Sequence, residues 1–173
     1  MIMKARGAQL LLPVSPVFMA ASLVAALALN LLPLGRVQWA PDWLLLLLAF
    51  WSLHQPRRVG LGRAFACGLA IDVHQGVLLG QHALVYSALV FVMHRAQRRL
   101  LWFPPWLQAL QLAPLFVAAQ LLLLLLRVLG GGLAPGWPAL LAPLLQALLW
   151  PLASWLLLAP QRRPPDQDDN RPL

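Results

Sequence analysis

Long apolar stretches alternate with short polar ones along most of the chain. They cover residues 11–32, 39–54, 106–129 and 138–158, and a further pair lies between Arg63 and Arg95. As α-helices they match or approach the roughly 20 residues needed to cross the hydrocarbon core of a bilayer. The pattern therefore predicts an all-α integral membrane protein with six transmembrane helices.

Two details of these stretches bear on the prediction. The first stretch follows Lys4 and Arg6 and so resembles the start of an export signal. It is longer than a signal-peptide core of about 7 to 15 residues, so an uncleaved helix is the preferred interpretation. In the second stretch Trp43 and Trp51 lie toward the two ends, where interfacial tryptophan is expected. Asp42 lies near the start of this stretch, and we assign it to a short outer loop.

Positive charges mark one side of the predicted membrane protein. Eleven of the 13 Lys and Arg residues form four clusters, which fall at every second gap between apolar stretches. The clusters are Lys4 and Arg6; Arg57, Arg58 and Arg63; Arg95, Arg98 and Arg99; and Arg162, Arg163 and Arg171. Because cytoplasmic loops retain Lys and Arg, this spacing predicts that both termini are cytoplasmic. Only Arg36 and Arg127 lie elsewhere.

The composition agrees with a chain that has lipid as its solvent. With 61% hydrophobic and 10% charged residues, it is not an ordinary soluble domain. The net charge of +8 is divided among separate clusters, so we predict no nucleic-acid partner. The single cysteine, Cys67, excludes an intramolecular disulfide. We predict one transmembrane domain over residues 1–160 and a disordered cytoplasmic tail over residues 161–173.

The predicted third and fourth helices have too few residues for two full crossings. Only 31 residues lie between Arg63 and Arg95, whereas two spans need about 40 before a turn is counted. Either the bilayer thins locally, or the polar apex at Asp72, His74 and Gln75 stays below the outer surface, lined by protein or water. We favour the sunken apex.

Five residues of the same segment recur at every fourth position, and four of them are small. They are Ala64, Gly68, Asp72, Gly76 and Gly80. On one helix they would share a face, and Gly76 and Gly80 would form a small-xxx-small pattern that favours close contact with a second helix. A turn after Asp72 would instead place both glycines in the connection. The sequence leaves both arrangements open.

Asp72 is the acid that the predicted membrane region must accommodate. An ionisable side chain there costs about 2.5 to 3.5 kcal/mol on insertion scales, so we expect it to have a role. The alternatives are a contact with a partner protein, a proton or ligand site, a pair with Arg127, or a cap of a helix or turn at the outer surface in contact with water. His74 and His82 follow it without the spacing of a helical zinc site.

No catalytic constellation is visible in the sequence. The serines and Cys67 have no His and acid at a recognisable spacing, and the chain has no Glu. The glycines at positions 130–132 lack the Lys and Ser or Thr of a phosphate loop. We therefore predict a protein that is not an enzyme, with no catalytic residues, no metal and no cofactor.

The segment from Pro41 to His94 resembles the MreD family of bacterial rod shape-determining proteins. The shared features are an aromatic second helix ending in Pro, a Val-Gly start of the third helix, then Gly-x-x-x-Asp, Gly and Leu-Gly-x-His-Ala. The matching residues are Trp51, Pro56, Val59, Gly60, Gly68, Asp72, Gly76, Leu79, Gly80, His82 and Ala83. Among them we expect structural roles for Trp51, Pro56 and Gly60, and a partner or cavity contact for Gly68, Asp72, Gly76, Gly80 and His82.

The resemblance implies a non-catalytic scaffold in the bacterial inner membrane, within the cell-elongation complex that synthesises peptidoglycan. It implies MreC, RodA and an elongation-specific class B penicillin-binding protein as partners, with MreB bound directly or through MreC. It also implies a fold similar to the substrate-binding subunits of energy-coupling-factor transporters, which have an outward cavity. The alternative function is a small-molecule-binding membrane subunit of a transporter of that kind.

Overall fold

The computed structural model describes residues 15–32, 39–133 and 135–161, and every regular element within them is helical. The α-helices are α1 (Pro16–Leu31), α2 (Trp43–His54), α3 (Leu61–Gln75), α4 (Gln81–Leu100), α5 (Pro105–Leu129) and α6 (Leu141–Leu158). Short 3₁₀ helices, η1 (Trp137–Leu140) and η2 (Ala159–Gln161), flank α6. The predicted all-α class is confirmed for the described residues. Lys4, Arg6, Arg36 and the predicted tail of residues 161–173, except for Gln161, lie outside them. Gln161 is buried and ends η2.

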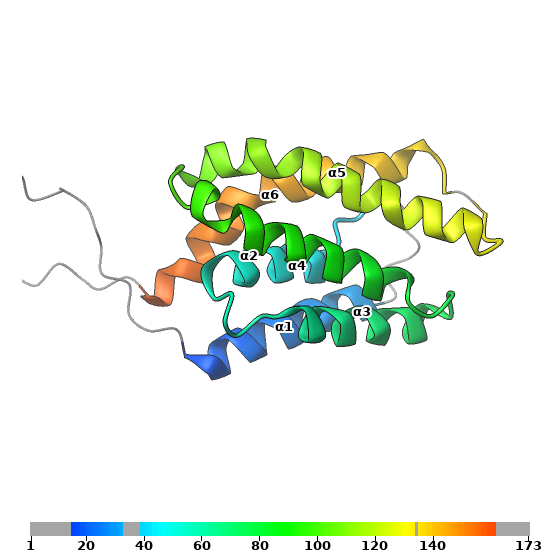
Figure 1. Cartoon of the computed structure of the whole chain (residues 1–173), viewed down its shortest axis with the longest axis horizontal. Coiled ribbons are helices and arrows are strands. Elements are labelled where there is room, and N and C mark those ends of the chain that lie inside the picture. Colours follow the sequence, from blue (N-terminus) through cyan, green and yellow to red (C-terminus); the bar gives the residue numbers. More distant parts are fainter. Residues whose placement is uncertain (1–14, 33–38, 134, 162–173) are drawn as a thin grey trace, which may run out of the picture.

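Successive helices run in opposite directions, so α1 begins and α6 ends at the same end of the bundle (Figure 1). The α2–α3 connection, with Arg57 and Arg58, and the last turn of α4, with Arg98 and Arg99, lie at that end too. We call it the basic end. The opposite end carries the α3–α4 connection (residues 76–80), and we call it the hairpin end.

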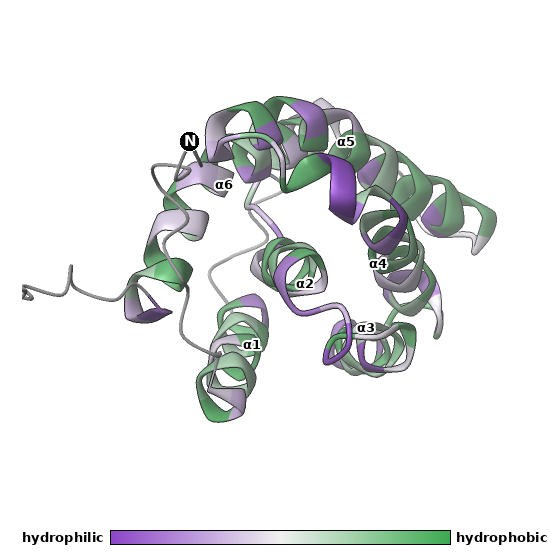
Figure 2. Cartoon of the chain, turned by 60° about the vertical axis from the view of Figure 1, so that its left-hand side comes forward, coloured by the Kyte–Doolittle hydropathy of each residue, from purple (hydrophilic) through white to green (hydrophobic). Residues whose placement is uncertain are grey.

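α2 lies at the centre of the bundle (Figure 2) and packs against α1, α4 and α6. Trp51 of this helix is fully buried. Its indole N–H donates to Ser22 Oγ of α1 at 2.8 Å, and its ring meets Phe18 and Phe50 edge-on. The prediction of an interfacial Trp51 is therefore wrong. A helix that is apolar all round gives no periodic signal for which side chains face inward.

Two segments of the described chain are long and apolar enough to cross a membrane, Pro105–Leu129 and Trp137–Gln161. α1 and α2 are also apolar but shorter. α3 has 15 residues, which makes it about 22 Å long. By length and composition alone, the described residues thus contain two candidate spans rather than the six that the hydropathy pattern predicts.

The α3–α4 connection is level with the end of α5. Gln81 Nε2 donates to the carbonyl oxygen of Leu126 at 3.4 Å. At the other end, α3 begins opposite His94, whose ring nitrogen lies 3.0 Å from the carbonyl oxygen of Val59. α4 continues six residues beyond His94 to Leu100, about 9 Å. The shortage of residues in this hairpin therefore falls at the start of α3, and the depth of the apex below the outer membrane surface stays a prediction.

Candidate functional site

Asp72 joins the last turn of α3 to the first turn of α4. Its carboxylate is fully buried. The carboxylate accepts the backbone N–H groups of Gly80 at 2.9 Å, His82 at 2.9 Å and Ala83 at 3.3 Å. The Nδ1 atom of His82 lies 2.7 Å from Oδ1 and must be the donor, because a carboxylate only accepts. One side chain of α3 therefore receives four hydrogen bonds from the start of α4.

These hydrogen bonds satisfy a requirement of every α-helix. Its first N–H groups have no partner within the helix, and its N-terminus carries a partial positive charge. Gly80 occupies the N-cap position of α4 and makes no side-chain capping bond. Asp72 supplies the cap from the neighbouring helix and places its negative charge where the helix dipole favours it. The cap accounts for a buried acid without a metal or a partner protein.

Gly76 and Gly80 lie in the connection rather than on a helix face. Gly76 ends α3 with φ 61°, and Gly80 precedes α4 with φ 102°. Such angles favour glycine, which has no Cβ to clash. The N–H of Gly76 bonds the Val73 carbonyl and the N–H of Val77 bonds the Asp72 carbonyl, each at 3.3 Å, as in a Schellman C-cap. The turn alternative is confirmed, and the small-xxx-small interpretation of Gly76 and Gly80 is wrong.

Gly68 allows the close approach of the two helices one turn below Asp72. A Cβ atom at this position would lie 2.4 Å from the Cα and N atoms of Ala83 and 2.6 Å from the carbonyl carbon of His82. Backbone atoms cannot move aside as a flexible side chain can. The face predicted from Ala64, Gly68 and Asp72 therefore does contact a helix, and that helix is α4 of the same chain.

Asp72 and His82 form a hydrogen bond of the kind found in catalytic acid–histidine pairs. Both side chains are buried within the helix bundle. His82 is 7% exposed, and its ring meets the ring of Tyr86 edge-on at 5.9 Å. No group of three or more His, Cys, Asp or Glu side chains that could hold a metal occurs in the described ranges. His74 is exposed on the last turn of α3. Asp72 and His82 are buried, and their hydrogen bond joins α3 to α4.

Pro56 and Gly60 lie in the α2–α3 connection at the basic end. Asp72 is far from them, in the last turn of α3. Pro56 is partly buried in the turn after α2. Gly60 is the N-cap of α3 with φ −96°, and the position of its missing Cβ is open. The fully buried residue here is Val59, whose carbonyl oxygen contacts His94. Glycine is therefore not sterically required at position 60.

A second acid, Asp42, connects four helices and has no counterpart among the predicted site residues. Its Oδ1 accepts the N–H of Leu45 at 2.9 Å and so caps α2. Asn30 of α1 donates to Oδ1 and Tyr86 of α4 to Oδ2, both at 2.6 Å. Gln146 of α6 donates to the Asp42 carbonyl oxygen at 3.0 Å. In the sequence, each of these residues is an isolated polar position at or within an apolar stretch. This pattern could have identified them.

The contacts of Asp72 bear on two of the alternatives for its role, the pair with Arg127 and the cap. Asp72 does not pair with Arg127, because its carboxylate is occupied by His82 and by the backbone N–H groups of α4. It caps a helix, as one alternative proposed, but within protein and not in contact with water.

Comparison with known proteins places this sequence in a family. Residues 8–159 match the sequence profile described as rod shape-determining protein MreD. The rod shape-determining protein MreD of Haemophilus influenzae is 32% identical over 126 residues, which cover 73% of this chain and 76% of that protein. No solved structure shows a significant match. The chain therefore belongs to the MreD family, membrane-associated proteins that act in determining the rod shape of the cell.

Proposed function

We propose that this chain is a non-catalytic scaffold of the bacterial inner membrane, which crosses the lipid six times and keeps both termini in the cytoplasm. Membership of the family supports a role in the shape-determining complex. The alternating direction of the six helices supports the topology, since Arg57, Arg58, Arg98 and Arg99 all fall at the basic end. Positively charged loops favour the cytoplasmic side.

The short central helix is compatible with this topology. α2 has 12 residues, about 18 Å, which is less than the roughly 30 Å of a hydrocarbon core. It packs against α1, α4 and α6 rather than standing alone in lipid. At its start, Asp42 is bonded by Asn30 and Tyr86. Irregular backbone within the membrane is tolerated where protein satisfies its polar groups, as it does here.

The observation that carries the scaffold proposal is the use of both described acids as helix caps. Asp42 and Asp72 are the acids within the described ranges, and both are occupied in joining helices. Neither is left as a general base. A chain whose few acidic groups hold its own helices together is rigid, and a rigid chain is suited to hold other proteins in a fixed arrangement.

The partners that we propose are MreC, RodA and an elongation-specific class B penicillin-binding protein, with MreB bound directly or through MreC. Gly68, Asp72 and His82 are buried, so we propose that they act on a partner by fixing the shape of the hairpin. Gly76 and Gly80 lie in the connection itself, where Leu78 and Leu79 are exposed beside them. We propose that Leu78 and Leu79 form the surface that contacts a partner protein directly.

The alternative, a small-molecule-binding subunit like those of energy-coupling-factor transporters, has one observation in its favour. A pocket of about 260 Å³ lies at the hairpin end, between the α3–α4 connection and the end of α5. Small-molecule sites usually measure about 300 to 1,000 Å³, so this pocket is small for a vitamin-sized solute. We keep the similarity to those subunits as a proposal about the fold and prefer the scaffold function.

The function is tested by replacing Asp72 with leucine in cells that depend on this protein. We expect membrane insertion to persist, while cell elongation and co-purification with MreC are impaired, because α4 loses its cap. The matched control is His74→Leu, which changes an exposed side chain on the same turn of α3. Normal rods together with normal recovery of MreC from the Asp72→Leu variant would contradict the proposal.

A further inference from the structure

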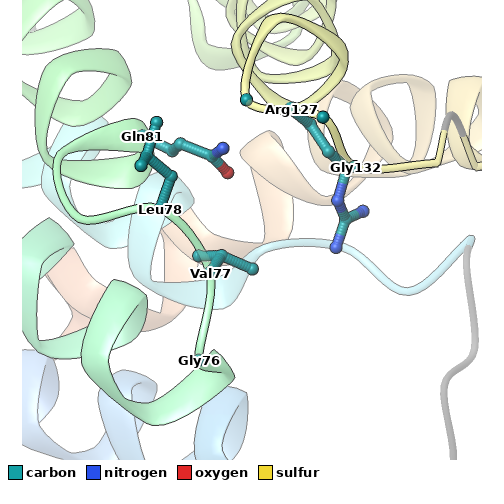
Figure 3. Close-up of a pocket in the computed structure, with 8 residues that line it drawn as sticks. Gly76, Val77, Leu78, Gln81, Arg127 and Gly132 are labelled. Carbon is teal, nitrogen blue, oxygen red and sulfur yellow. The ribbon is translucent and has the colours of Figure 1, made fainter.

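Arg127 and the glycines at positions 130–132 line one pocket. None of them takes part in the helix caps formed by Asp42 and Asp72. The pocket is lined by Arg127, Gln81, the start of the α3–α4 connection (residues 76–78) and the three glycines, and has a volume of about 260 Å³. In Figure 3 the side chains of Gln81 and Arg127 come from different helices, α4 and α5, and lie on the two sides of the pocket. Arg127 is in the last turn of α5 and is partly buried.

The guanidinium of Arg127 has no acidic partner in the part of the chain that the structure describes. Asp72 uses its carboxylate on α4 and His82, and Asp42 uses its own on α2, Asn30 and Tyr86. Arg127 also departs from the charge pattern, because the other described arginines lie at the basic end. The negative end of the α5 dipole favours a cation in this last turn but offsets only part of its charge, so the partly buried guanidinium still requires compensation. An external anion would provide that compensation.

The chemistry of the pocket and its rim indicates what kind of anion fits. A guanidinium presents several N–H donors in a planar fork that suits phosphate oxygens. Gln81 bonds the Leu126 carbonyl through Nε2, and its amide nitrogen has a second N–H for a ligand. Leu78 lines the pocket and is 61% exposed, and Leu129 and Leu133, which flank the three glycines in the sequence, are 74% and 92% exposed. A polar floor with an exposed leucine rim favours a lipid headgroup over a free ion.

We propose that this pocket binds the phosphate group of a membrane phospholipid, with Arg127 as its cation and the exposed leucines against the acyl chains. The volume accommodates a headgroup phosphate and leaves the acyl chains outside. The proposal rests on the membrane location proposed above but not on the scaffold function or its partners. A failure of lipid binding is therefore distinguishable from a failure to assemble with MreC.

The test uses the purified full chain in a maltoside detergent, which carries no phosphate, with native mass spectrometry as the measurement. Short-chain phosphatidylglycerol is titrated in one arm and inorganic phosphate in the other. We expect the lipid to bind at least about tenfold more tightly than inorganic phosphate, because its chains add apolar contact. Equal binding of inorganic phosphate would overturn the lipid assignment.

Variants locate the site. Arg127→Gln should weaken binding of the first lipid by about tenfold or more, whereas Arg127→Lys keeps the charge without the fork and should fall between Arg127→Gln and the wild type. Arg95→Gln removes a charge at the basic end, beside Phe91, and should leave the first lipid unaffected. An equal loss with Arg95→Gln would show general charge attraction and overturn the proposal, as would unchanged binding by Arg127→Gln.

Gly132→Ala keeps the charge of Arg127 but changes the position of its side chain. It serves as a control for a folding defect in Arg127→Gln. A Cβ on Gly132 would lie 3.0 Å from Cγ and 3.1 Å from the carbonyl oxygen of Arg127, so Gly132→Ala requires Arg127 to shift by a few tenths of an ångström. We expect weaker lipid binding with an unchanged thermal unfolding transition. Lipid binding at the wild-type level by a folded Gly132→Ala variant would contradict the proposal.

Discussion

The hydroxyl of Tyr86 donates a hydrogen bond of 2.6 Å to Oδ2 of Asp42, the residue that caps α2. One turn earlier on the same helix, His82 contacts Asp72, the residue that caps α4. α4 thus bonds through its side chains to both acids of the described ranges, and each acid lies at the N-terminus of a helix. Buried acids are costly in an apolar bundle, and here helix dipoles and N–H groups compensate both.

Replacing Tyr86 with phenylalanine should isolate the contribution of its contact with Asp42. The aromatic ring stays, but Asp42 loses one of its side-chain donors, so we expect the free energy of unfolding to fall by roughly 1.5 to 3 kcal/mol. Reversible denaturant unfolding in detergent micelles measures it. Ser87→Ala is the control, because that hydroxyl bonds only the Ala83 carbonyl of its own helix. Equal effects of the two substitutions would refute a special role for the Tyr86–Asp42 bond.

Replacing Asp72 should expose the first amides of α4. Asp72→Ala leaves the N–H groups of Gly80, His82 and Ala83 without their acceptor in a buried position, so we expect a loss of about 3 kcal/mol or more in the free energy of unfolding. Asp72→Asn keeps one acceptor oxygen and should fall between alanine and wild type. Hydrogen exchange provides the measurement, since these three amides should lose protection first. Unchanged protection in Asp72→Ala would rule out the cap.

Gly68→Ala should force α3 and α4 apart. The added methyl would lie 2.4 Å from the backbone of Ala83, and overpacking of this kind costs about 1 to 3 kcal/mol. Gly62→Ala is the matched control in the same helix, because its Cβ position is open. There the better helix propensity of alanine should leave stability unchanged or raise it by up to about 1 kcal/mol. Thermal unfolding of both variants decides the matter, and a tolerated Gly68→Ala would contradict the close contact.

Cysteine labelling should place the two ends of the bundle on opposite sides of the membrane. In a Cys67→Ala background, Leu79→Cys lies in the α3–α4 connection, where the native side chain is 64% exposed. An impermeant thiol reagent added outside the cytoplasmic membrane should label it. Arg99→Cys, in the last turn of α4, should react only after permeabilisation. Labelling of both positions from the same side would rule out the proposed topology.

Local sequence was sufficient for the helical class and for marking the α3–α4 segment. An acid in an apolar stretch is costly in any fold, so Asp72 could be singled out before its contacts were known. Glycine at positions 76 and 80 left two arrangements open, because the same residue suits a helix contact and a positive φ. The backbone angles of 61° and 102° decide for the turn.

The contacts that hold the bundle together could not be predicted in this way. Asp42 and Gln146 are 104 residues apart, and Asp42 and Tyr86 are 44 apart, so no local motif joins them. The burial of Trp51 was missed for a related reason, since its helix is apolar on every side. Both depend on which helices become neighbours.

The sequence alone therefore determined the helical character, the end of the bundle that carries the arginines and the segment that contains the unusual acid. These depend on hydropathy and charge along short stretches of chain. Only the tertiary structure decided that Asp72 caps α4, that Asp42 joins four helices and that Arg127 remains without an acid among the described residues. A hydrogen bond needs two groups within about 3 Å, and the packing of distant helices sets that distance.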